Sequence, residues 1–297
     1  MTQSVGVIGM GNMGGAMAAN LLSAGFQVVG CDPSAIACRH VKEAGGEIVR
    51  SPGEVAARTD VIILSLPSAG ALDAVVTGPE GLVASGCSGT VVIEMSTLSL
   101  DTKRKALDAL AHANQILLDA PISGTGEQAR NRDLVVFASG DVAAYEKSLP
   151  PLQAISRRQI HVGVFGNGSM MKFIANHLVT IHNVAAGEAF ALAIKAGLDP
   201  QLAYDVLQDS AGSSRMFQVR GPQMVRGRYD EPTATIRIHL KDLDVIRGFA
   251  AEVGMPLPLF SAASQYYQIG LAQGRGDEDT ASVCAVSESL GGVVRSK

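Results

Sequence analysis

The sequence predicts an α/β domain followed by an all-α domain, with one long helix joining them. In the N-terminal half, short β-branched runs alternate with longer helical patterns. These runs are apolar throughout, as expected for strands that are covered on both faces. After Gly168 the strand patterns stop. Strands separated by helices of this length form right-handed βαβ units, so the first domain should contain a parallel sheet of the Rossmann type.

The elements of the first domain follow in order along the chain. The expected strands of the parallel sheet are Val5–Ile8, Gln27–Cys31, Val61–Leu64 and Val91–Ile93. The helical patterns between and after them are Met13–Ala24, Ala35–Ala44 and Asp101–His112. From Leu134 to Val162 the runs "LVVFASGD" and "RRQIHVGVFG" predict strands of a mixed sheet that close the domain.

The C-terminal half reads as helices only. Ser169–Ala196 predicts one long helix that ends at Gly197, before Asp199 and Pro200. Further helices are expected at Gln201–Gln208, Leu240–Val253 and Phe260–Gln273. We therefore expect a boundary near Gly163–Gly168, with domains at residues 1–164 and 165–297, and a long helix that belongs to both.

Composition and charge describe a globular chain and limit its partners. Hydrophobic residues make up 47% and charged residues 18%, which is typical of a soluble folded protein. A formal net charge of −4 gives no reason to expect a nucleic acid or an anionic membrane as a partner. No apolar stretch of about eighteen residues is found, so no membrane span is expected. The first residues also lack the basic start of a signal peptide.

The cysteines and histidines show no metal-ligand spacing. The four cysteines form no C-x-x-C pair, so we expect free thiols in a reducing cytoplasm. His177 and His182 are five residues apart, which does not place them on one helix face at i and i+4. The sequence therefore predicts no metal site. The four cysteines are Cys31, Cys38, Cys87 and Cys284.

The segment "VGVIGMGNMGGAM" contains Gly9, Gly11 and Gly14 in a G-x-G-x-x-G pattern between a strand and a helix. Gly9 permits the tight turn, Gly11 lets a pyrophosphate approach the backbone, and Gly14 lets the helix pack closely. The free N–H groups of the helix then face the phosphates. We expect this turn to bind a dinucleotide. Its intervening residues are Met10, Asn12 and Met13.

A carboxylate follows the second expected strand. Asp32 lies about twenty residues after the glycine turn, where an acidic side chain accepts hydrogen bonds from the adenine ribose. A 2′-phosphate would meet like charge there, so NAD is favoured and NADP remains the alternative. Arg39 is the one nearby base that argues for NADP, but its place in the following helix favours a surface role.

Two polar stretches follow later strands of the first domain. In "EMSTLS", Ser96 and Thr97 should lie at the carboxyl edge of the sheet and contact the cofactor, although either could instead cap the next helix. In "DAPISGTGEQA", Ser123, Gly124 and Thr125 offer two hydroxyls and backbone N–H groups on one loop. Such a loop suits a small carboxylate or hydroxy-acid substrate. The alternative is a plain glycine-rich turn.

A lysine and an asparagine lie near the start of the long helix. In "GVFGNGSMMKFIANH", Lys172 and Asn176 are four residues apart and share one helix face. An ammonium near a helix N-terminus is unfavourable with respect to the dipole, and apolar neighbours penalise its charge. Both effects favour release of the proton, which a general acid/base needs. The alternative is a solvated surface lysine.

At this point the chain resembles the β-hydroxyacid dehydrogenase family, which includes 3-hydroxyisobutyrate dehydrogenase and tartronate semialdehyde reductase. The resemblance covers essentially the whole chain and depends on six motifs in order. They are "GMGNMG", "LP" at Leu66-Pro67, "ST" at Ser96-Thr97, "DAPISG", "GNGSMMKFIAN" and "LKDL" at Leu240–Leu243.

The resemblance implies an NAD(P)-dependent oxidoreductase that moves a hydride between the nicotinamide and a small β-hydroxy acid or the matching semialdehyde or keto acid. Lys172 would be the general acid/base, and Asn176 would orient it or bind substrate. Ser123 and Gly124 would bind the substrate carboxylate. On the cofactor side the resemblance implies contacts from Leu66, Pro67, Thr97 and Lys241, with Asp242 supporting Lys241.

This chain also departs from the family pattern. The family usually has a small residue, often Gly, where this chain has Thr125, so we expect a smaller or more polar substrate than 3-hydroxyisobutyrate.

Two alternative functions are an imine reductase-like enzyme, which typically lacks the lysine, and a non-catalytic module that keeps the cofactor. The apolar segment at Phe249–Gly270 predicts a homodimer or homotetramer.

Overall fold

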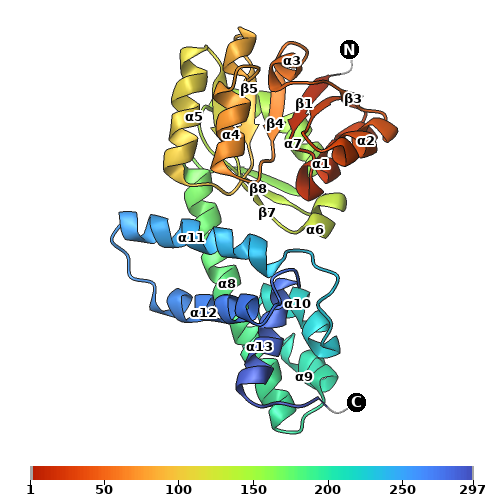
Figure 1. Cartoon of the computed structure of the whole chain (residues 1–297), viewed down its shortest axis with the longest axis vertical. Coiled ribbons are helices and arrows are strands. Elements are labelled where there is room, and N and C mark those ends of the chain that lie inside the picture. Colours follow the sequence, from red (N-terminus) through yellow and green to blue (C-terminus); the bar gives the residue numbers. More distant parts are fainter. Residues whose placement is uncertain (1–2, 296–297) are drawn as a thin grey trace. The chain divides into compact units, whose positions relative to one another are not determined.

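A computed structural model describes residues 3–295 of the chain (Figure 1). The chain divides into two compact units, Met1–Lys172 and Phe173–Lys297. The first unit is built on β-sheets and the second consists of helices. The predicted fold class, a Rossmann-type α/β domain followed by an all-α region with a long helix at their junction, is confirmed.

The first unit contains a six-stranded sheet in the order β3-β2-β1-β4-β5-β6, in which all pairs are parallel. This order is the doubly wound arrangement that places ligands at the carboxyl ends of the strands. All four strands predicted for this sheet are present. The bounds are β1 (Ser4–Ile8), β2 (Gln27–Cys31), β3 (Glu47–Ile48), β4 (Val61–Leu64), β5 (Val91–Glu94) and β6 (Ile116–Asp119).

Both faces of this sheet are covered, which explains the apolar strands. Along β4, Val61 and Ile63 belong to one buried cluster, while Ile62 and Leu64 belong to another. Helices α1, α2 and α7 contribute to the first cluster, and α3, α4 and α5 contribute to the second. Their bounds are α1 (Asn12–Ser23), α2 (Ala35–Glu43), α3 (Pro52–Ala56), α4 (Ala69–Thr77), α5 (Leu100–His112) and α7 (Val142–Ile155).

A second, three-stranded sheet closes the first unit. Strands β7 (Ile122–Ser123) and β8 (Val135–Ala138) are antiparallel, and β8 pairs in parallel with β9 (Arg158–His161). The predicted mixed sheet is confirmed. Helix α7 between β8 and β9 was not predicted, because Pro150 and Pro151 lie inside it and proline usually ends a helix.

The second unit is formed by helices, and the long helix α8 (Asn167–Lys195) begins in the first unit. The helices that follow are α9 (Pro200–Leu207), α10 (Arg215–Arg226), α11 (Ile236–Glu252), α12 (Pro258–Ala272) and α13 (Val283–Leu290). Helices α10, which contains Pro222, and α13 were not predicted. Helix α11 begins before the expected Leu240, because the hydroxyl of Thr235 accepts the Ile238 N–H and caps it.

Helix α8 is also long and apolar enough, by length and composition, to cross a membrane. An 18-residue window of it has a mean hydropathy of 1.2, which the sequence analysis overlooked, and 44% of that window is buried. A single helix of this kind is weak support for a membrane span, because the core helix of a globular protein meets the same criteria.

Candidate active site

The glycine turn between β1 and α1 leaves room for a ligand at one position. Gly9 has a φ of +84°, and a Cβ there would lie 2.3 Å from the carbonyl oxygen of Ser65. A Cβ on Gly14 would lie 1.8 Å from the carbonyl oxygen of Gly9, so the helix packs directly on the turn. A Cβ on Gly11 would have nothing within 4 Å. Open space above Gly11 fits the close approach of a diphosphate to the backbone.

Asp32 follows β2 beside this turn. One oxygen of its carboxylate accepts the Met10 N–H at 2.5 Å, and the other accepts the Ser34 N–H at 2.7 Å. The side chain stays partly exposed. A carboxylate can accept about four hydrogen bonds, so these two contacts leave Asp32 able to accept the hydroxyls of a ribose. The residues at this turn therefore fit a bound dinucleotide.

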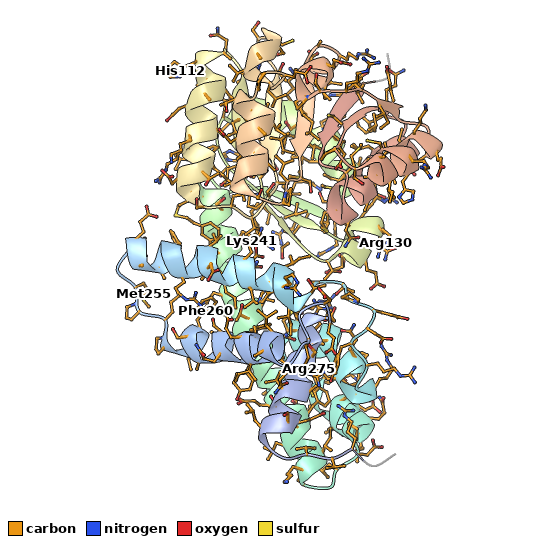
Figure 2. All side chains as sticks on the ribbon, viewed as in Figure 1. His112, Arg130, Lys241, Met255, Phe260 and Arg275 are labelled. Atoms are coloured by element: carbon orange, nitrogen blue, oxygen red, sulfur yellow. The ribbon has the colours of Figure 1, made fainter. Side chains whose placement is uncertain are left out.

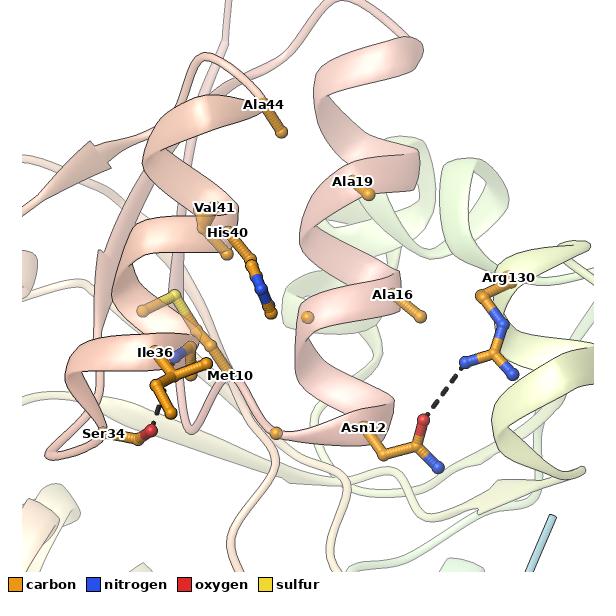
Figure 3. Close-up of a pocket in the computed structure, with 13 residues that line it drawn as sticks. Met10, Asn12, Ala16, Ala19, Ser34, Ile36, His40, Val41, Ala44 and Arg130 are labelled. Atoms are coloured by element: carbon orange, nitrogen blue, oxygen red, sulfur yellow. Dashed lines mark hydrogen bonds between the residues drawn. The ribbon is translucent and has the colours of Figure 1, made fainter. Parts of the chain in front are cut away.

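A cavity of about 440 Å³ extends from the glycine turn along α1 and α2 (Figure 3). Arg130, at the end of α6 (Gly126–Arg130), lines it and donates a hydrogen bond to Asn12 Oδ1 at 3.2 Å. This arginine was not among the predicted site residues. No sequence motif links Arg130 to the glycine turn, because the two are far apart in the chain and only the fold brings the guanidinium to the N-terminus of α1.

The loops after β4 and β5 are tied to each other. The Ser96 hydroxyl accepts the Leu66 N–H at 2.8 Å, and the Ser96 N–H donates to Glu94 Oε1 at 2.9 Å. Neither Ser96 nor Thr97 caps the next helix, because the hydroxyl of Ser99 accepts the Thr102 N–H at the start of α5. That alternative is wrong. Leu66 and Thr97 therefore lie on loops at the carboxyl edge of the sheet.

The predicted substrate loop contains β7 and the start of α6. Ser123 pairs with Val135 and its side chain is half-buried. Gly124 has a φ of +147°, and a Cβ there would lie 2.5 Å from Leu134, so this position needs glycine. The Thr125 hydroxyl accepts the Gln128 N–H at 3.3 Å in a capping box. Thr125 thus shapes the loop, besides the contact with substrate that the sequence predicts.

Lys172 lies two residues further into its helix than expected, because the helix was expected to begin at Ser169. Helix α8 begins at Asn167, so Lys172 falls in the second turn, where the dipole acts more weakly than in the first. At this earlier start, the hydroxyl of Ser139 accepts the Gly168 N–H and the carboxylate of Asp119 accepts the Ser169 N–H. Lys172 is buried, with 8% of its surface exposed.

In the helical unit, Asn176 belongs to a small polar cluster with two residues of α11. Asn176 Nδ2 donates to Asp242 Oδ2 at 2.9 Å. Lys241 Nζ lies 3.5 Å from Asp242 Oδ1, and the lysine side chain is 39% exposed. Figure 2 labels Lys241 on α11. The expected support of Lys241 by Asp242 is present. Asp242 also fixes the amide of Asn176, four residues after Lys172 on α8.

A buried charge cluster of Glu94, Lys103 and Asp119 was also missed. Three charged residues far apart in the sequence give no local pattern that could reveal it.

The four cysteines are free, as expected. Over residues 3–295, no group of three or more His, Cys, Asp or Glu side chains could hold a metal ion.

Family models match both parts of the chain. Residues 4–182 match the NAD-binding domain of 6-phosphogluconate dehydrogenase. Residues 166–287 match the NAD-binding domain of NADP-dependent 3-hydroxyisobutyrate dehydrogenase. The two matches overlap on the start of α8, which carries Lys172.

Several relatives match over nearly their whole length. The chain is 35% identical to L-threonate dehydrogenase of Cupriavidus necator, over 96% of each chain. It is 31% identical to 2-(hydroxymethyl)glutarate dehydrogenase of Eubacterium barkeri, over 97% of this chain and 96% of the relative. The crystal structure of 3-hydroxyisobutyrate dehydrogenase from Salmonella typhimurium superposes with a TM-score of 0.86 at 32% identity, covering 96% of this chain and 99% of that one.

The glycine turn, the carboxylate after β2 and the lysine on α8 thus occur together in a chain whose relatives are dehydrogenases. The chain belongs to the β-hydroxyacid dehydrogenase family and is an NAD(P)-dependent oxidoreductase that acts on CH–OH groups.

Proposed function

We propose that this enzyme interconverts a small, polar β-hydroxy acid and its carbonyl form with NAD, and that Lys172 is the general acid/base. The observation that carries the proposal is the burial of Lys172 on α8, one turn before an Asn176 amide held by Asp242. Burial by itself favours the neutral form of a lysine, which is the form that accepts a proton. A buried lysine on this helix therefore supports a role in proton transfer.

The bound nicotinamide supplies the hydride chemistry. The chain itself moves the proton: the neutral Lys172 amine takes it from the substrate hydroxyl during oxidation, and the ammonium returns it to the carbonyl oxygen during reduction. The Ser123 hydroxyl and the Gly124 N–H bind the substrate carboxylate, because both are donors on the loop that follows β6. Asn176 orients Lys172 or contacts the substrate.

Thr125 supports a polar substrate. The position is filled by a threonine rather than by glycine, and its side chain is fixed by the capping box with Gln128. The added bulk favours an acid that lacks a methyl branch. L-threonate, the substrate in the name of a relative that is 35% identical, is a compact polar acid of this kind.

Asp32 supports NAD over NADP. Its carboxylate is held beside the glycine turn by two backbone N–H groups, where the 2′-phosphate of NADP would meet a fixed negative charge. The turn residues Gly9, Met10, Gly11, Asn12, Met13 and Gly14 would hold the diphosphate, and Leu66, Pro67, Thr97 and Lys241 would contact the rest of the cofactor.

We also propose that the enzyme forms a homodimer or a homotetramer in the cytoplasm. Leu202 and Val206 lie four residues apart on α9 and are 54% and 62% exposed, and Leu259 at the start of α12 is 70% exposed. Exposed apolar side chains of this size mark surfaces that a second copy can cover. Light scattering should give a mass that is a multiple of 30.8 kDa, and a single-chain mass would contradict the assembly.

The two alternatives have less support. An imine reductase-like activity or a non-catalytic module would not require a buried lysine with a positioned asparagine beside it. The relatives at 30% identity or more are named as dehydrogenases and a reductase of oxygen-bearing acids and aldehydes.

The deciding experiment follows NADH absorbance across a panel of hydroxy acids. The panel contains L-threonate, 2-(hydroxymethyl)glutarate and 3-hydroxyisobutyrate, each offered with NAD and with NADP. We expect turnover with NAD and a loss of about 10²- to 10⁴-fold in kcat for Lys172→Ala, because the variant lacks the acid/base group. NADH binding should be retained. Equal activity of Lys172→Ala and the wild type would refute the role of Lys172.

A Thr125→Gly variant tests the substrate class on the same panel. We expect its kcat/KM ratio for 3-hydroxyisobutyrate over L-threonate to rise about tenfold, since removing a side chain of this size changes discrimination by a kcal/mol or more. Glycine is also accepted at the start of a helix, so the fold should persist. An unchanged preference would exclude Thr125 as the cause of substrate choice.

A further inference from the structure

Two buried carboxylates lie side by side where β5 and β6 end. Glu94 and Asp119 are register partners in the parallel sheet, and the side chains of both are fully buried. Two negative charges in an apolar environment repel each other, and each also loses its hydration. A pair of this kind persists only if another group compensates the charge.

Lys103 supplies that compensation. It lies in the first turn of α5, the helix that connects β5 to β6, and its side chain is fully buried. Its Nζ lies 2.6 Å from Glu94 Oε2 and 2.8 Å from Asp119 Oδ1. Burial alone would lower the pKa of Lys103, but the charges of Glu94 and Asp119 outweigh it and the pKa is raised. The ammonium is therefore a charged bridge between the two strand ends.

On the Glu94 side, hydrogen bonds lead from this bridge to the expected cofactor loops. Glu94 Oε1 accepts the Ser96 N–H at 2.9 Å. The hydroxyl of Ser96 in turn accepts the Leu66 N–H at 2.8 Å. Glu94 thereby fixes the two loops that carry Leu66 and Thr97.

On the Asp119 side, hydrogen bonds lead to the start of α8. Asp119 Oδ2 accepts the Ser169 N–H and Oδ1 accepts the Ser169 hydroxyl, both at 2.7 Å. Ser139 adds a bond to Asp119 Oδ2 at 3.2 Å and accepts the Gly168 N–H at 3.0 Å. Lys172 follows Ser169 by three residues on the same helix. The position of Lys172 in the first unit therefore depends on Asp119.

We infer that Lys103 is a positioning residue for the reaction: by bridging Glu94 and Asp119 it fixes the start of α8, and with it Lys172, relative to the loops expected to hold the nicotinamide. Lys103 touches no reacting atom. This inference rests on the proposed function, because it takes Lys172 as the acid/base. A misplacement of about 1 Å at reacting groups can cost on the order of 100-fold in rate, so a rigid bridge at this point has a kinetic consequence.

The test compares Lys103→Met with Lys105→Met. Lys105 is a lysine on the same helix whose side chain is 76% exposed and forms an ion pair with Asp101 of that helix. For Lys103→Met we expect one NADH bound per chain, a Kd for NADH within about twofold, and a kcat reduced about 10- to 100-fold on the best acid of the panel. Lys105→Met should match the wild type. If Lys103 only stabilised the fold, part of the Lys103→Met protein would be unfolded. The number of NADH molecules bound per chain would then fall by the same factor as kcat, which would contradict the inference.

If Lys103→Met does not fold, Ser169→Ala provides the answer. It removes one hydrogen bond between Asp119 and α8 and leaves every charge in place. A several-fold lower kcat with unchanged NADH binding supports the inference. A wild-type kcat in folded Lys103→Met overturns the inference. If Lys103→Met does not fold, a wild-type kcat in Ser169→Ala overturns it. The proposed function fails separately, if the wild type turns over no acid or if Lys172→Ala stays active.

Discussion

The two sides of the carboxyl edge of the main sheet place acidic residues in opposite environments. Beside β2, Asp32 is partly exposed and its carboxylate is held by the N–H groups of Met10 and Ser34. At the ends of β5 and β6, Glu94 and Asp119 are fully buried and share Lys103. An acid at the end of a parallel strand can thus bind a ligand or hold the protein together. Its partners decide which.

The difference follows from register and from the helices that follow. The last register pair of β2 and β1 joins Cys31 to Ile8, so Asp32 faces no second acid. The last pair of β5 and β6 joins Glu94 to Asp119, which demands a cation. Helix α5 brings Lys103 to this point, whereas α2 begins at Ala35 after its Ser34 cap.

The largest effect on stability should come from removing the cation between the two buried acids at the ends of β5 and β6. Lys103→Met leaves two adjacent buried carboxylates without their partner, and we expect the free energy of unfolding to fall by about 3–5 kcal/mol. Urea denaturation monitored by circular dichroism measures this change.

The double variant Lys103→Met/Glu94→Gln sharpens this test. Like the wild-type cluster it carries one net negative charge, and it keeps the Ser169 contacts of Asp119. It should recover most of the lost stability. No recovery would mean that packing rather than charge governs this cluster.

A smaller effect, on cofactor affinity, should follow from removing the partly exposed acid beside β2. Asp32→Ala removes the proposed acceptor of the ribose hydroxyls, so we expect the Kd for NADH to rise about tenfold. The Kd for NADPH should fall or stay constant, because the like charge at the 2′-phosphate is gone. Fluorescence titration with both cofactors measures the ratio. Glu43→Ala, an exposed acid at the end of α2, is the charge-matched control and should change neither Kd.

The smallest effect concerns Cys31, the buried neighbour of Asp32. Burial, with Cys38 next in importance, raises the pKa of the Cys31 thiol from 9.0 to about 11. The unfolded chain therefore loses this proton at lower pH than the folded chain, so the free energy of unfolding should decrease as pH rises from 9 to 11. Urea denaturation at pH 8 and pH 10 measures the decrease, which should be smaller in Cys31→Ala. A slope identical to the wild type would show that other groups cause it.

Local sequence determined four of the six strands of the main sheet and the α/β nature of the first unit. The apolar strands, the glycine turn and Asp32 are short-range patterns whose physical meaning depends on neighbours in the chain, so they could be read without a structure. The parallel sheet followed from the alternation of strands with helices, whereas the order of the strands came from the structure. Helices with internal prolines, α7 and α10, were missed because packing in the fold overrides their low propensity.

Tertiary structure alone decided which distant groups meet. The Glu94–Asp119 register brings together residues from two strands, and Lys103 reaches them from the helix between. Arg130 approaches Asn12 and Asp242 fixes Asn176 across even longer separations. The sequence by itself determined that a glycine turn follows the first strand and that a long helix carries Lys172. The charges that position them were decided only by folding, because a contact between residues far apart leaves no periodicity in the chain.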